Sequence, residues 1–543
     1  MNGTKTAPHH PRPSPTPASS AAAIPPPCKR FRRANNMAAT TIQERRKNSA
    51  AGGWVIQKFG GTSVGKFPAQ IAENIVGPSM KDNKIAIVCS ARSTDTKAEG
   101  TTNRLILAAE EALKPSSRLY VGIVDAIRED HIRASKEVIS DPEVLQSLQV
   151  EIEEECAHLA SFLGAAQIID EISPKTKDAI IGTGEKLSCM FMAALLKDRG
   201  IDAEYVDLGN VVDTTYNSKG GLNQDFYDAL SKNLAERIEQ CGDKLPVVTG
   251  YFGVVPGSLL TSVGRGYTDL CAALLAVGLD AHELQVWKEV DGIFTADPRK
   301  VVTARLISII TPEEAAELTY YGSEVIHPFT MEQVIRARIP IRIKNVENPS
   351  GEGTMIFPDT LARKGEDTPS EIPRHFRNRS HDALLQPRHL RPTAVTTKSN
   401  IVVLNVHSNR KSLSHGFLAG IFQILDQHQL CVDLISTSEV HVSMALQSEV
   451  KDHALKQALE ELKRHGSVDV IRNLTILSLV GKQMKHMIGI AGRMFTTLAK
   501  ANVNIEMISQ GASEINISCV INEDDAIRAM NVLHTQLFTY QDM

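Results

Sequence analysis

The last third of the chain contains an internal repeat, and this repeat limits the possible folds more than any other feature. The first copy consists of residues 416–422, 432–436 and 440–444. The second copy consists of the corresponding residues 489–495, 505–509 and 515–519. An apolar strand-like run precedes each copy, at 401–406 and 474–479. Each half then has the order strand, helix, strand, strand, helix, strand, which is ferredoxin-like. The sequence therefore predicts two small α+β domains, at residues 398–470 and 471–540.

A different pattern occupies residues 54–361, where short apolar runs alternate with helical segments. The strand-like runs are residues 55–59, 85–89, 180–181, 246–249 and 283–287, and helical patterns occur at 105–113 and 185–197. The run at 85–89 is continuously apolar, as expected for a parallel strand whose two faces are both covered. Alternation of strands and helices predicts an α/β layer architecture for this region.

Two segments have the composition of chain that forms no core of its own. Residues 1–53 are rich in Pro, Ala, Ser and His and carry one acidic residue, Glu44, among many Lys and Arg residues. Such a segment cannot bury enough apolar surface to order itself. We interpret it as a disordered basic tail; a transit peptide or a nuclear signal at 29–33 is the alternative, and Met37 is a candidate start. Residues 362–397, with four prolines and little periodicity, are interpreted as a linker.

Charge, hydropathy and cysteine usage narrow the class of protein. The 543 residues carry a formal net charge of -4, so no strong attraction to nucleic acid or membrane is expected. No apolar run approaches the roughly 20 residues of a membrane-spanning helix, which predicts a soluble protein. The eight cysteines are scattered, without C-x-x-C pairs or zinc spacing. This distribution suits a reducing compartment and predicts no metal site.

A glycine motif after the first strand has the residue types of an anion-binding loop. In Lys58-Phe-Gly-Gly-Thr-Ser63 the glycines let the backbone approach a phosphate, and N–H groups at a helix N-terminus stabilise anions. Lys66 adds a positive charge nearby. The pattern is not that of a Walker P-loop, G-x-x-x-x-G-K-[ST]. By itself, a Gly-Gly pair is more often only a turn.

Three further motifs are equally weak when each is taken alone. Residues 182–185 predict a glycine turn that opens a helix, in which Glu185 is alternatively a capping or dipole residue. In Gly264-Arg-Gly-Tyr-Thr-Asp269, the arginine between glycines can grip a carboxylate in bidentate fashion, whereas Asp269 alone is typical of a helix N-cap. Residues 287–299 follow a strand, where open α/β sheets bind ligands.

Together these motifs resemble those of aspartate kinases of the amino-acid kinase family, and in particular of the monofunctional fungal enzymes. The motifs that carry the resemblance are 58–63, Ser90-Ala91-Arg92, 100–103, 184–188, 264–269, 290–299 and 322–328. Residues 432–439 resemble the regulatory ACT domain of the same enzymes. The resemblance covers about residues 54–530, and it implies an αβα sandwich catalytic domain with a mainly parallel sheet, followed by two ACT domains.

The resemblance also implies roles for single residues. The catalytic set would be Lys58, Gly61 and Asp269, where Asp269 positions the lysine. Aspartate would be held by Ser90, Thr102, Glu185 (its α-ammonium group) and Arg265 (its α-carboxylate). ATP would be bound by Lys58, Gly60, Gly61, Thr62, Ser63, Lys66, Lys288, Glu289, Phe294 and Arg299. An effector would bind at Lys411, Ser414, Gly416, Phe417, Asp433 and Ser438, the alternative being that these residues only pack their domain.

A few positions depart from the family pattern. Lys288-Glu289 stands where the family often has Thr-Asp, Phe294 where it has Tyr, and Glu324 where many relatives have Lys. These departures concern the contacts to adenine and phosphate.

The implied reaction moves the γ-phosphoryl group of ATP, with Mg²⁺, to the β-carboxylate of L-aspartate and gives 4-phospho-L-aspartate and ADP. The acceptor carboxylate has a reference pKa near about 4, so it is already ionised and needs no general base. Catalysis then rests on positioning and on neutralising the transferred charge, by Lys58, backbone amides and Mg²⁺. The resemblance implies no tightly bound cofactor. The reaction would be the first step toward threonine, methionine and isoleucine, and in some organisms lysine.

The paired ACT domains imply feedback inhibition and a homo-oligomer, at least a dimer, because the effector would bind between ACT domains. Resemblance to the fungal enzymes makes threonine the expected effector, with lysine the alternative. It also implies a cytoplasmic location, or a plastid if the basic leader is a transit peptide.

Other functions fit the sequence less well. A glutamate or N-acetylglutamate kinase shares the glycine loops, but the ACT pair and the Arg265 motif favour aspartate. A bifunctional kinase–dehydrogenase needs a G-x-G-x-x-G strand–helix unit, and the sequence contains none. A non-enzymatic amino-acid sensor would have lost one of the residues Lys58, Glu185, Arg265 and Asp269, all of which are present.

Overall fold

The structure, a computed structural model, describes most of the chain after residue 44. The described residues are 45–93, 99–212, 222–255, 257–320, 326, 328–357, 391–408, 416–438, 440–447, 452–482, 484–511 and 515–539. Most of the predicted basic tail, most of the predicted linker and the divergent residue Glu324 lie outside the described residues.

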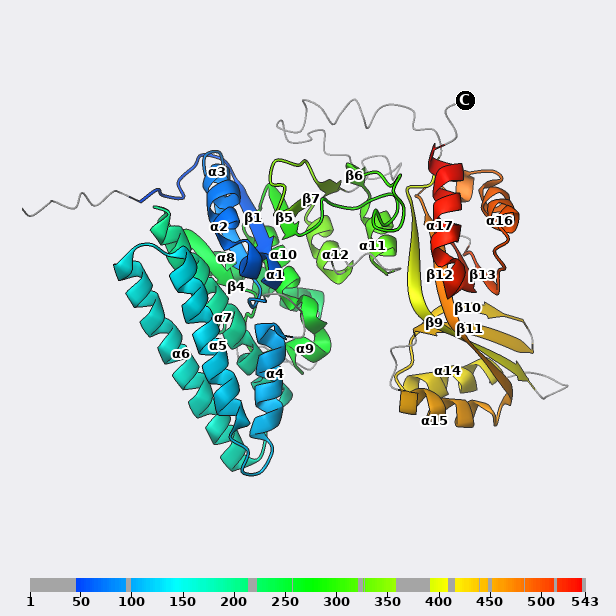
Figure 1. Ribbon diagram of the computed structural model, residues 1–543, viewed down its shortest axis with the longest axis horizontal. Helices are drawn as coiled ribbons and strands as arrows, with labels where there is room; N and C mark the ends of the chain where they lie inside the picture. The colour runs from blue at the N-terminus through cyan, green and yellow to red at the C-terminus, as the bar shows by residue number, and fades with distance from the viewer. Residues whose placement is uncertain are drawn as a thin grey trace, which may run out of the picture. The chain divides into compact units, whose positions relative to one another are not determined.

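The first large sheet in the described chain has eight strands and is mainly parallel (Figure 1). In spatial order the strands are β3 (Ala203–Val206), β4 (Leu245–Thr249), β2 (Lys84–Cys89), β1 (Trp54–Phe59), β5 (Glu283–Lys288), β7 (Ile341–Asn345), β8 (Thr354–Ile356) and β6 (Ile309–Ile310). Neighbouring strands run parallel, except that β7 and β8 are antiparallel. The predicted parallel character of this sheet is confirmed.

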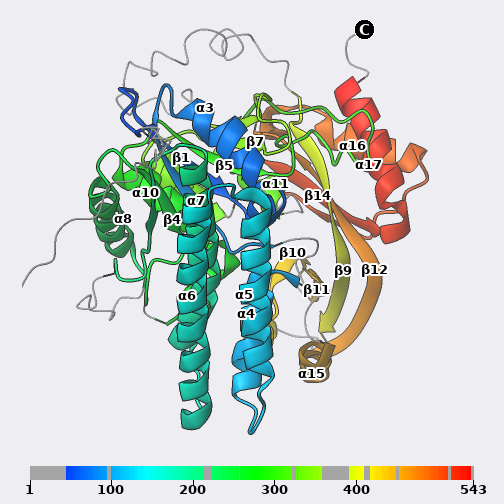
Figure 2. The same cartoon turned by 60° about the vertical axis from the view of Figure 1, so that its left-hand side comes forward.

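Helices cover both faces of the eight-stranded sheet (Figures 1 and 2). One face packs on η1 (Ile71–Val76), α4 (Thr101–Ala112), α5 (Leu119–Val138), α6 (Pro142–Ile169) and α7 (Pro174–Asp198). The other packs on α8 (Gln224–Glu239), α10 (Tyr267–Gly278), α11 (Pro312–Tyr320) and α12 (Pro328–Arg336). The short helices are α1 (Gly61–Lys66), α2 (Pro68–Gln70), α3 (Gly77–Ser79), α9 (Leu259–Ser262) and η4 (Gly264–Gly266). The three layers confirm the predicted αβα sandwich.

Strand β2 shows why its sequence is apolar without interruption. Ile85, Ile87 and Cys89 lie in the apolar cluster on the α4–α7 side, whereas Ala86 and Val88 lie in the cluster on the α8–α10 side. Successive side chains of a strand point to opposite faces, so a strand covered on both faces needs apolar residues at every position. Full burial of each large aliphatic side chain stabilises the fold by about 1.5–3 kcal/mol.

Helix α7 differs from the sequence prediction. Residues 180–181 lie inside α7, so the predicted strand there is wrong, and so is the predicted helix-opening turn at 182–185. A short apolar run does not distinguish a buried helix from a strand by its periodicity. The glycines of this stretch serve close packing rather than a turn. A Cβ on Gly184 would lie 3.0 Å from both Ala91 Cβ and Leu105 Cδ1.

Helix α7 is also the described helix that is long and apolar enough, by length and composition, to cross a membrane. However, 83% of its most apolar window is buried inside the protein. The apolar composition of α7 is therefore explained by its burial as the central helix of the α4–α7 layer.

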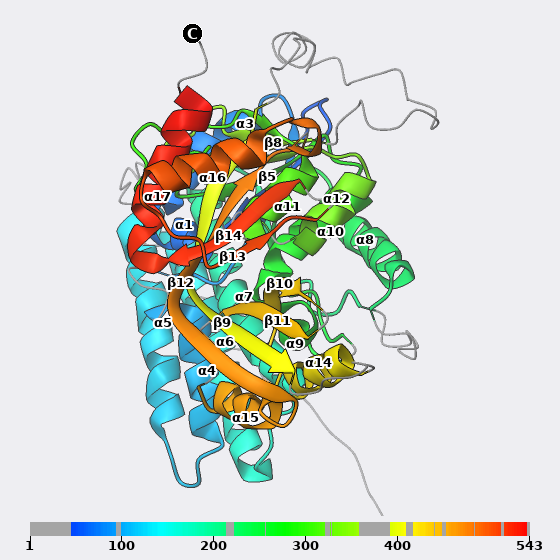
Figure 3. The same cartoon turned by 90° about the vertical axis from the view of Figure 1, so that its right-hand side faces the viewer.

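The C-terminal third contains a six-stranded sheet in the order β10-β11-β9-β12-β14-β13 (Figure 3). Its strands are β9 (Ala394–Ser408), β10 (Val432–Thr437), β11 (His441–Gln447), β12 (Gly466–Val480), β13 (Met507–Ser509) and β14 (Asn516–Asn522). Its helices are α14 (Phe417–Gln427), α15 (Asp452–Leu462), η6 (Met484–His486), α16 (Ile490–Lys500), η7 (Glu523–Asp525), α17 (Ala526–His534) and η8 (Thr535–Thr539). The apolar core of the first half packs on α14 and α15, and that of the second half on α16 and α17.

The two halves of this sheet exchange strands through β9 and β12, which run side by side and antiparallel along their whole length (Figure 3). Residues 394–398 of β9 pair with 476–480 of β12 and supply the fourth strand of the second half. The predicted boundary at 397/398 therefore lies inside β9, and the second small domain is not contiguous in sequence. The interpretation of residues 394–397 as linker is therefore wrong: they belong to a strand, and local periodicity did not indicate its partner, which lies more than 70 residues away.

Candidate active site

Adjacent parallel strands bring several motifs to one edge of the eight-stranded sheet. Strands β2, β1 and β5 are neighbours, and Phe59 pairs in register with Cys89 on one side and Trp287 on the other. Loops after the carboxyl ends of parallel strands are where open α/β sheets bind ligands. The motifs that begin at Ser90 and Lys288 therefore lie beside the glycine loop that follows β1.

Lys58 and Asp269 form an ion pair at this edge. Lys58 is the penultimate residue of β1, and its Nζ lies 2.7 Å from Oδ1 of Asp269. The two side chains are only 10% and 16% exposed. Asp269 lies in the first turn of α10, whose N-cap is Gly266, so the N-cap interpretation of Asp269 is wrong. Because attraction at this distance is strong away from bulk water, the pair holds the lysine cation at the end of β1.

The glycine loop passes directly from β1 into α1, as predicted from the sequence. Gly60 is the N-cap of α1, and the first N–H groups of a helix have no acceptor within the helix. A Cβ on Gly61 would lie 2.1 Å from the carbonyl oxygen of Ala91, so only glycine fits there. The carbonyl of Gly61 accepts a 2.9 Å hydrogen bond from the N–H of Ser93. The loop is thus packed tightly against the segment that follows β2, with Lys58 beside it.

Ser63 joins the glycine loop to the end of β5. Its side chain is fully buried, and its Oγ donates a 2.6 Å hydrogen bond to Oε1 of Glu289. Two residues that the sequence assigns separately to nucleotide binding therefore contact each other. The Ser63 hydroxyl is occupied by this carboxylate, while Glu289 itself remains exposed at the mouth of the loop.

Glu185 is a buried carboxylate in the middle of α7. Its Oε1 accepts a 2.5 Å hydrogen bond from the Thr268 hydroxyl, and its Oε2 accepts a 2.6 Å hydrogen bond from the N–H of Tyr251. Thr268 precedes Asp269 on α10, and Tyr251 follows β4, so both partners come from elements at the same edge. Glu185 is 1% exposed and is therefore fixed in one orientation.

The environment of Glu185 changes its acidity. Burial raises the pKa of its carboxyl group to about 7, against the opposing effect of hydrogen bonds from Thr268 and Tyr251 and of the Lys58 charge. A buried carboxylate with a pKa near neutral pH suits the recognition of a cation, because a bound ammonium group would stabilise the charged form. Strongly shifted carboxylates of this kind are concentrated at functional sites.

Two of the other predicted substrate residues, Ser90 and Thr102, are next in sequence to Ala91 and Thr101, which pack against Gly184, the residue before Glu185. Ser90 follows β2, and Thr102 lies in the first turn of α4; both are half-buried. Thr101, which the sequence did not single out, is buried, and its hydroxyl has no hydrogen-bond partner among the described residues. The backbone of Arg265 belongs to η4, directly before α10, but its side chain lies outside the described part of the structure.

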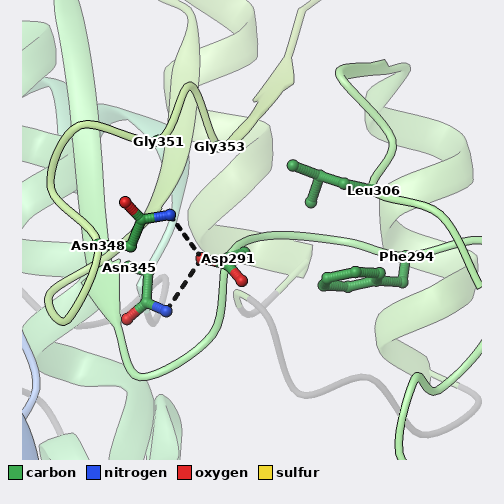
Figure 4. A pocket seen from close by; sticks show the side chains of 7 residues that line it. All are labelled: Asp291, Phe294, Leu306, Asn345, Asn348, Gly351 and Gly353. Carbon is green, nitrogen blue, oxygen red and sulfur yellow. Dashed lines mark hydrogen bonds between the residues drawn. The ribbon is translucent and has the colours of Figure 1, made fainter.

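A cavity of about 250 Å³ lies beside the end of β5 and β7 (Figure 4). Its lining residues are Asp291, Phe294, Leu306, Asn345, Asn348, Gly351 and Gly353. The amides of Asn345 and Asn348 point toward Asp291 and donate hydrogen bonds of 3.1 and 3.4 Å to its Oδ1. Phe294 and Leu306 supply an apolar side. The cavity thus combines an apolar wall with polar groups, as small-molecule sites usually do.

Phe294 was assigned to this region from the sequence, but the residues after β7 were not. Asn345 is the last residue of β7 and Asn348 follows the strand, and this position at the end of a strand was the available signal. The segment was missed because it matches no glycine motif. Lys288 ends β5, in register with Asn345.

The remaining predicted nucleotide residues are more exposed. Lys66 ends α1 at the surface, and Thr62 is half-buried. The Arg299 side chain is 88% exposed and makes two 3.0 Å hydrogen bonds to the Asp297 carboxylate. Neither Lys66 nor Arg299 lines the described cavity.

The predicted effector residues have different surroundings. Lys411 and Ser414 lie outside the described residues. Gly416 is the N-cap of α14 with a left-handed backbone, φ 82°, and Phe417 is buried in the core of the first half, which fits the packing alternative for that residue. Ser438 is exposed after β10.

Asp433 connects the first half of the six-stranded sheet to α11. Its Oδ1 accepts a 2.8 Å hydrogen bond from Lys398 Nζ and a 3.3 Å hydrogen bond from the Tyr320 hydroxyl. Lys398 also lies 4.9 Å from the centre of the Tyr320 ring. Side chains of the chain itself therefore engage the carboxylate that the sequence assigns to effector binding.

Comparison with protein families identifies both parts of the chain. The model of the amino acid kinase family matches residues 53–345, and an ACT domain model matches residues 477–537. The aspartokinase of Candida albicans is 57% identical over 495 residues, which are 90% of each chain. The aspartokinase of Schizosaccharomyces pombe is 56% identical over 485 residues, 89% of this chain and 93% of its own.

Solved structures agree with these relatives. A crystal structure of Escherichia coli aspartokinase III in complex with aspartate and ADP matches with a TM-score of 0.66 and 29% identity, over 89% of this chain and 99% of that one. A second structure of the same protein, in complex with lysine and aspartate, matches with a TM-score of 0.68 and the same identity and coverage.

Proposed function

The chain belongs to the amino acid kinase family and, within it, to the aspartokinases, and from this premise we propose that it transfers the γ-phosphoryl group of ATP to the β-carboxylate of L-aspartate under feedback control by L-threonine. The observation that carries the proposal is the ion pair of Lys58 and Asp269 beside the packed glycine loop. The Lys58 charge also lowers the pKa of the buried Glu185 carboxyl group, which places the two groups in one site. Together these groups offer a cation for phosphate and an anion for an ammonium group.

In the proposed step, one β-carboxylate oxygen of aspartate forms a bond to the γ-phosphorus of ATP. The bond between this phosphorus and the β–γ bridging oxygen breaks, and ADP leaves with the electron pair. No proton is transferred, because the acceptor is already ionised near neutral pH. The chain therefore needs to orient two anions and to neutralise the moving charge.

Each group of the site has a place in this step. Lys58, held by Asp269, provides positive charge at the glycine loop, whose first N–H groups provide further donors. Glu185 binds the α-ammonium group of aspartate. The cavity with Phe294 and the asparagines accommodates the nucleoside part of ATP. Mg²⁺ would arrive with the phosphates, and Glu289, oriented by Ser63, offers a carboxylate oxygen of the kind that Mg²⁺ prefers.

Threonine is proposed as the effector because the relatives at 55–57% identity are fungal aspartokinases, the group that the sequence resembles. Lysine is the alternative, since the solved structure of E. coli aspartokinase III holds lysine together with aspartate. The effector would bind one conformation better than the other, through ACT domains that pair in a homo-oligomer. The cytoplasmic location stays a prediction.

A hydroxamate-trapping assay tests the reaction and its regulation. The acyl phosphate product reacts with hydroxylamine, so we expect MgATP-dependent hydroxamate from aspartate and not from glutamate, and suppression by threonine. Suppression by lysine alone would leave the reaction in place and change the effector. Absence of hydroxamate from well-folded protein would contradict the proposed reaction.

A second test concerns the glycine loop. Replacing Gly61 with alanine places a methyl group 2.1 Å from the Ala91 carbonyl oxygen, so the loop must move. Because small displacements of catalytic groups are costly, kcat/KM for ATP is expected to fall about a hundredfold. Gly122→Ala in α5 is the matched control: Gly122 is exposed and nothing would lie within 4 Å of its Cβ, so at most about a twofold change is expected. Equal losses in the two variants, measured by steady-state kinetics, would show that the tight packing of Gly61 is irrelevant.

A further inference from the structure

We infer that His534, in the second half of the six-stranded sheet domain, is a positioning residue for the loop that lines the nucleotide cavity. This loop runs from Asp291 to Leu306 and is called the cavity loop below. The inference rests on the proposed function in one respect, the assignment of the cavity to ATP. His534 itself lies at the end of α17 and is not one of the residues that line the cavity.

Both ring nitrogens of His534 bind the cavity loop. Nε2 lies 2.8 Å from the Thr295 hydroxyl, and Nδ1 lies 3.1 Å from the Thr303 hydroxyl. His534 is fully buried, and its ring stacks on Phe538 with the centroids 4.9 Å apart. A neutral imidazole has one donor and one acceptor nitrogen, and a hydroxyl group can complement either. One side chain thus bridges the two arms of the loop.

The residues that His534 holds are next to the residues that line the cavity. Phe294 and Leu306 form an antiparallel bridge and face the cavity (Figure 4). Thr295 directly follows Phe294, and Arg305 directly precedes Leu306. The Thr295 hydroxyl accepts a hydrogen bond from the N–H of Arg305, and the Arg305 carbonyl accepts one from the N–H of Thr295. Because neighbouring residues in extended chain point to opposite sides, one side of the loop lines the cavity and the other contacts α17.

Other contacts fix the same side of the loop to the second half. Arg305 Nη2 donates a 2.7 Å hydrogen bond to the carbonyl of Phe538, and Asn531 Nδ2 donates one of 2.9 Å to the carbonyl of Lys300. Ala296 and Val301 belong to the same apolar cluster as the α16 and α17 side chains. A displacement of α17 must therefore move the loop, and with it the apolar wall of the cavity.

The His534 side chain suits the role of a neutral hydrogen-bonding bridge better than that of a charged group. Burial lowers the pKa of its imidazole, and the nearby Arg305 charge acts in the same direction. The ring is neutral at physiological pH and keeps one acceptor nitrogen, which a protonated ring would lose. We therefore expect its effect to appear in the geometry of nucleotide binding, and not in the chemical step.

The test measures nucleotide binding in the full chain after the bridge is removed. For His534→Ala we expect the KM for MgATP, and the dissociation constant of ADP measured by calorimetry without aspartate, to rise about tenfold. The kcat and the KM for aspartate should stay within about twofold. His534→Gln, which can still donate and accept, should recover a large part of the loss. His486→Ala, an exposed histidine of the same half, is the matched control and should behave as wild type.

Thr303→Val separates positioning from folding, because Thr303 is exposed and valine keeps its shape. We expect the ADP dissociation constant to rise about threefold in the wild-type background and not at all in His534→Ala, since the two share one hydrogen bond. Unchanged ADP binding in Thr303→Val and in folded His534→Ala would overturn the inference, as would an equal rise in KM for both substrates. If wild-type protein binds ADP but does not phosphorylate aspartate, the proposed function fails while the binding measurements still decide this inference.

Discussion

Replacing Lys58 with methionine is expected to lower kcat for aspartate phosphorylation about a thousandfold. Methionine keeps much of the length and apolar stem of the lysine but removes the cation that Asp269 holds 2.7 Å away at the end of β1. In phosphoryl transfer the enzyme contributes mainly positioning and charge neutralisation, so the loss of one fixed cation acts on the transition state. The measurement is steady-state kinetics by hydroxamate trapping at saturating MgATP and aspartate.

The control must separate catalysis from folding, because Lys58→Met leaves Asp269 without its partner. An unpaired, mostly buried carboxylate costs roughly 1–3 kcal/mol in the free energy of unfolding. The double variant Lys58→Met/Asp269→Asn removes both charges, and we expect it to regain much of that stability and none of the activity. Lys81→Met removes an exposed lysine that has no role in the proposed site and should leave kcat nearly unchanged. Activity in Lys58→Met above about a tenth of wild type would contradict the role given to Lys58.

The family, the sandwich fold and the setting of the glycine loop followed from local patterns in the sequence. The strand before Gly60-Gly61 and the helix after it are local features, so the sequence predicted the loop between them. The contact that excludes a side chain at Gly61 is with the carbonyl oxygen of Ala91, on another segment, and it was not predicted. The ion pair of Lys58 and Asp269 joins residues more than 200 positions apart, and only the family resemblance predicted it. Physical reasoning from the residues alone gave the N-cap interpretation of Asp269, which the structure contradicts.

What the sequence did not predict depends on contacts between distant segments. Residues 394–397, part of the predicted linker, include three β-branched residues of the kind that favour strands, yet nothing local says that they complete the second half of the sheet by pairing with 476–480. The cavity loop likewise has no feature in its own residues that points to His534, more than 200 positions away. Such contacts depend on shape and hydrogen bonding in the folded chain, so they cannot be predicted from local periodicity.

The second large effect concerns Glu185, whose replacement with glutamine should raise the KM for aspartate about a hundredfold at pH 8. Glutamine keeps the shape, and its carbonyl oxygen can still accept one of the hydrogen bonds from Thr268 and Tyr251, but it carries no charge for the α-ammonium group of aspartate. Removing one partner of a buried, charged hydrogen bond typically costs a few kcal/mol of binding. Glu110→Gln, on the outer surface of α4, is the matched control.

The pH dependence distinguishes this role from a purely structural one. Burial raises the pKa of Glu185 to about 7, so in the free enzyme the carboxylate becomes protonated as the pH falls from 8 to 6. In wild type, kcat/KM for aspartate should therefore fall about tenfold over that range, whereas in Glu185→Gln it should stay flat. Because Lys58 lowers this pKa, Lys58→Met should move the wild-type profile to higher pH. A profile in Glu185→Gln that still falls like that of wild type would assign the titration to another group.

For Glu185→Gln, we expect the free energy of unfolding to be unchanged or higher than in wild type, although the activity is lower. Between the ordinary pKa of a glutamate, 4.5, and about 7, the folded state keeps a proton on Glu185 that the unfolded state has lost. The free energy of unfolding therefore falls as the pH rises through this window, and the contribution of Glu185 to that fall should vanish in Glu185→Gln. We expect the variant to be at least as stable as wild type at pH 8, by urea denaturation, although it binds aspartate poorly. Because the buried carboxylate lowers stability, its presence is explained by the ligand that it binds. If Glu185→Gln is both less stable and less active than wild type at pH 8, Glu185 instead has a structural role in α7.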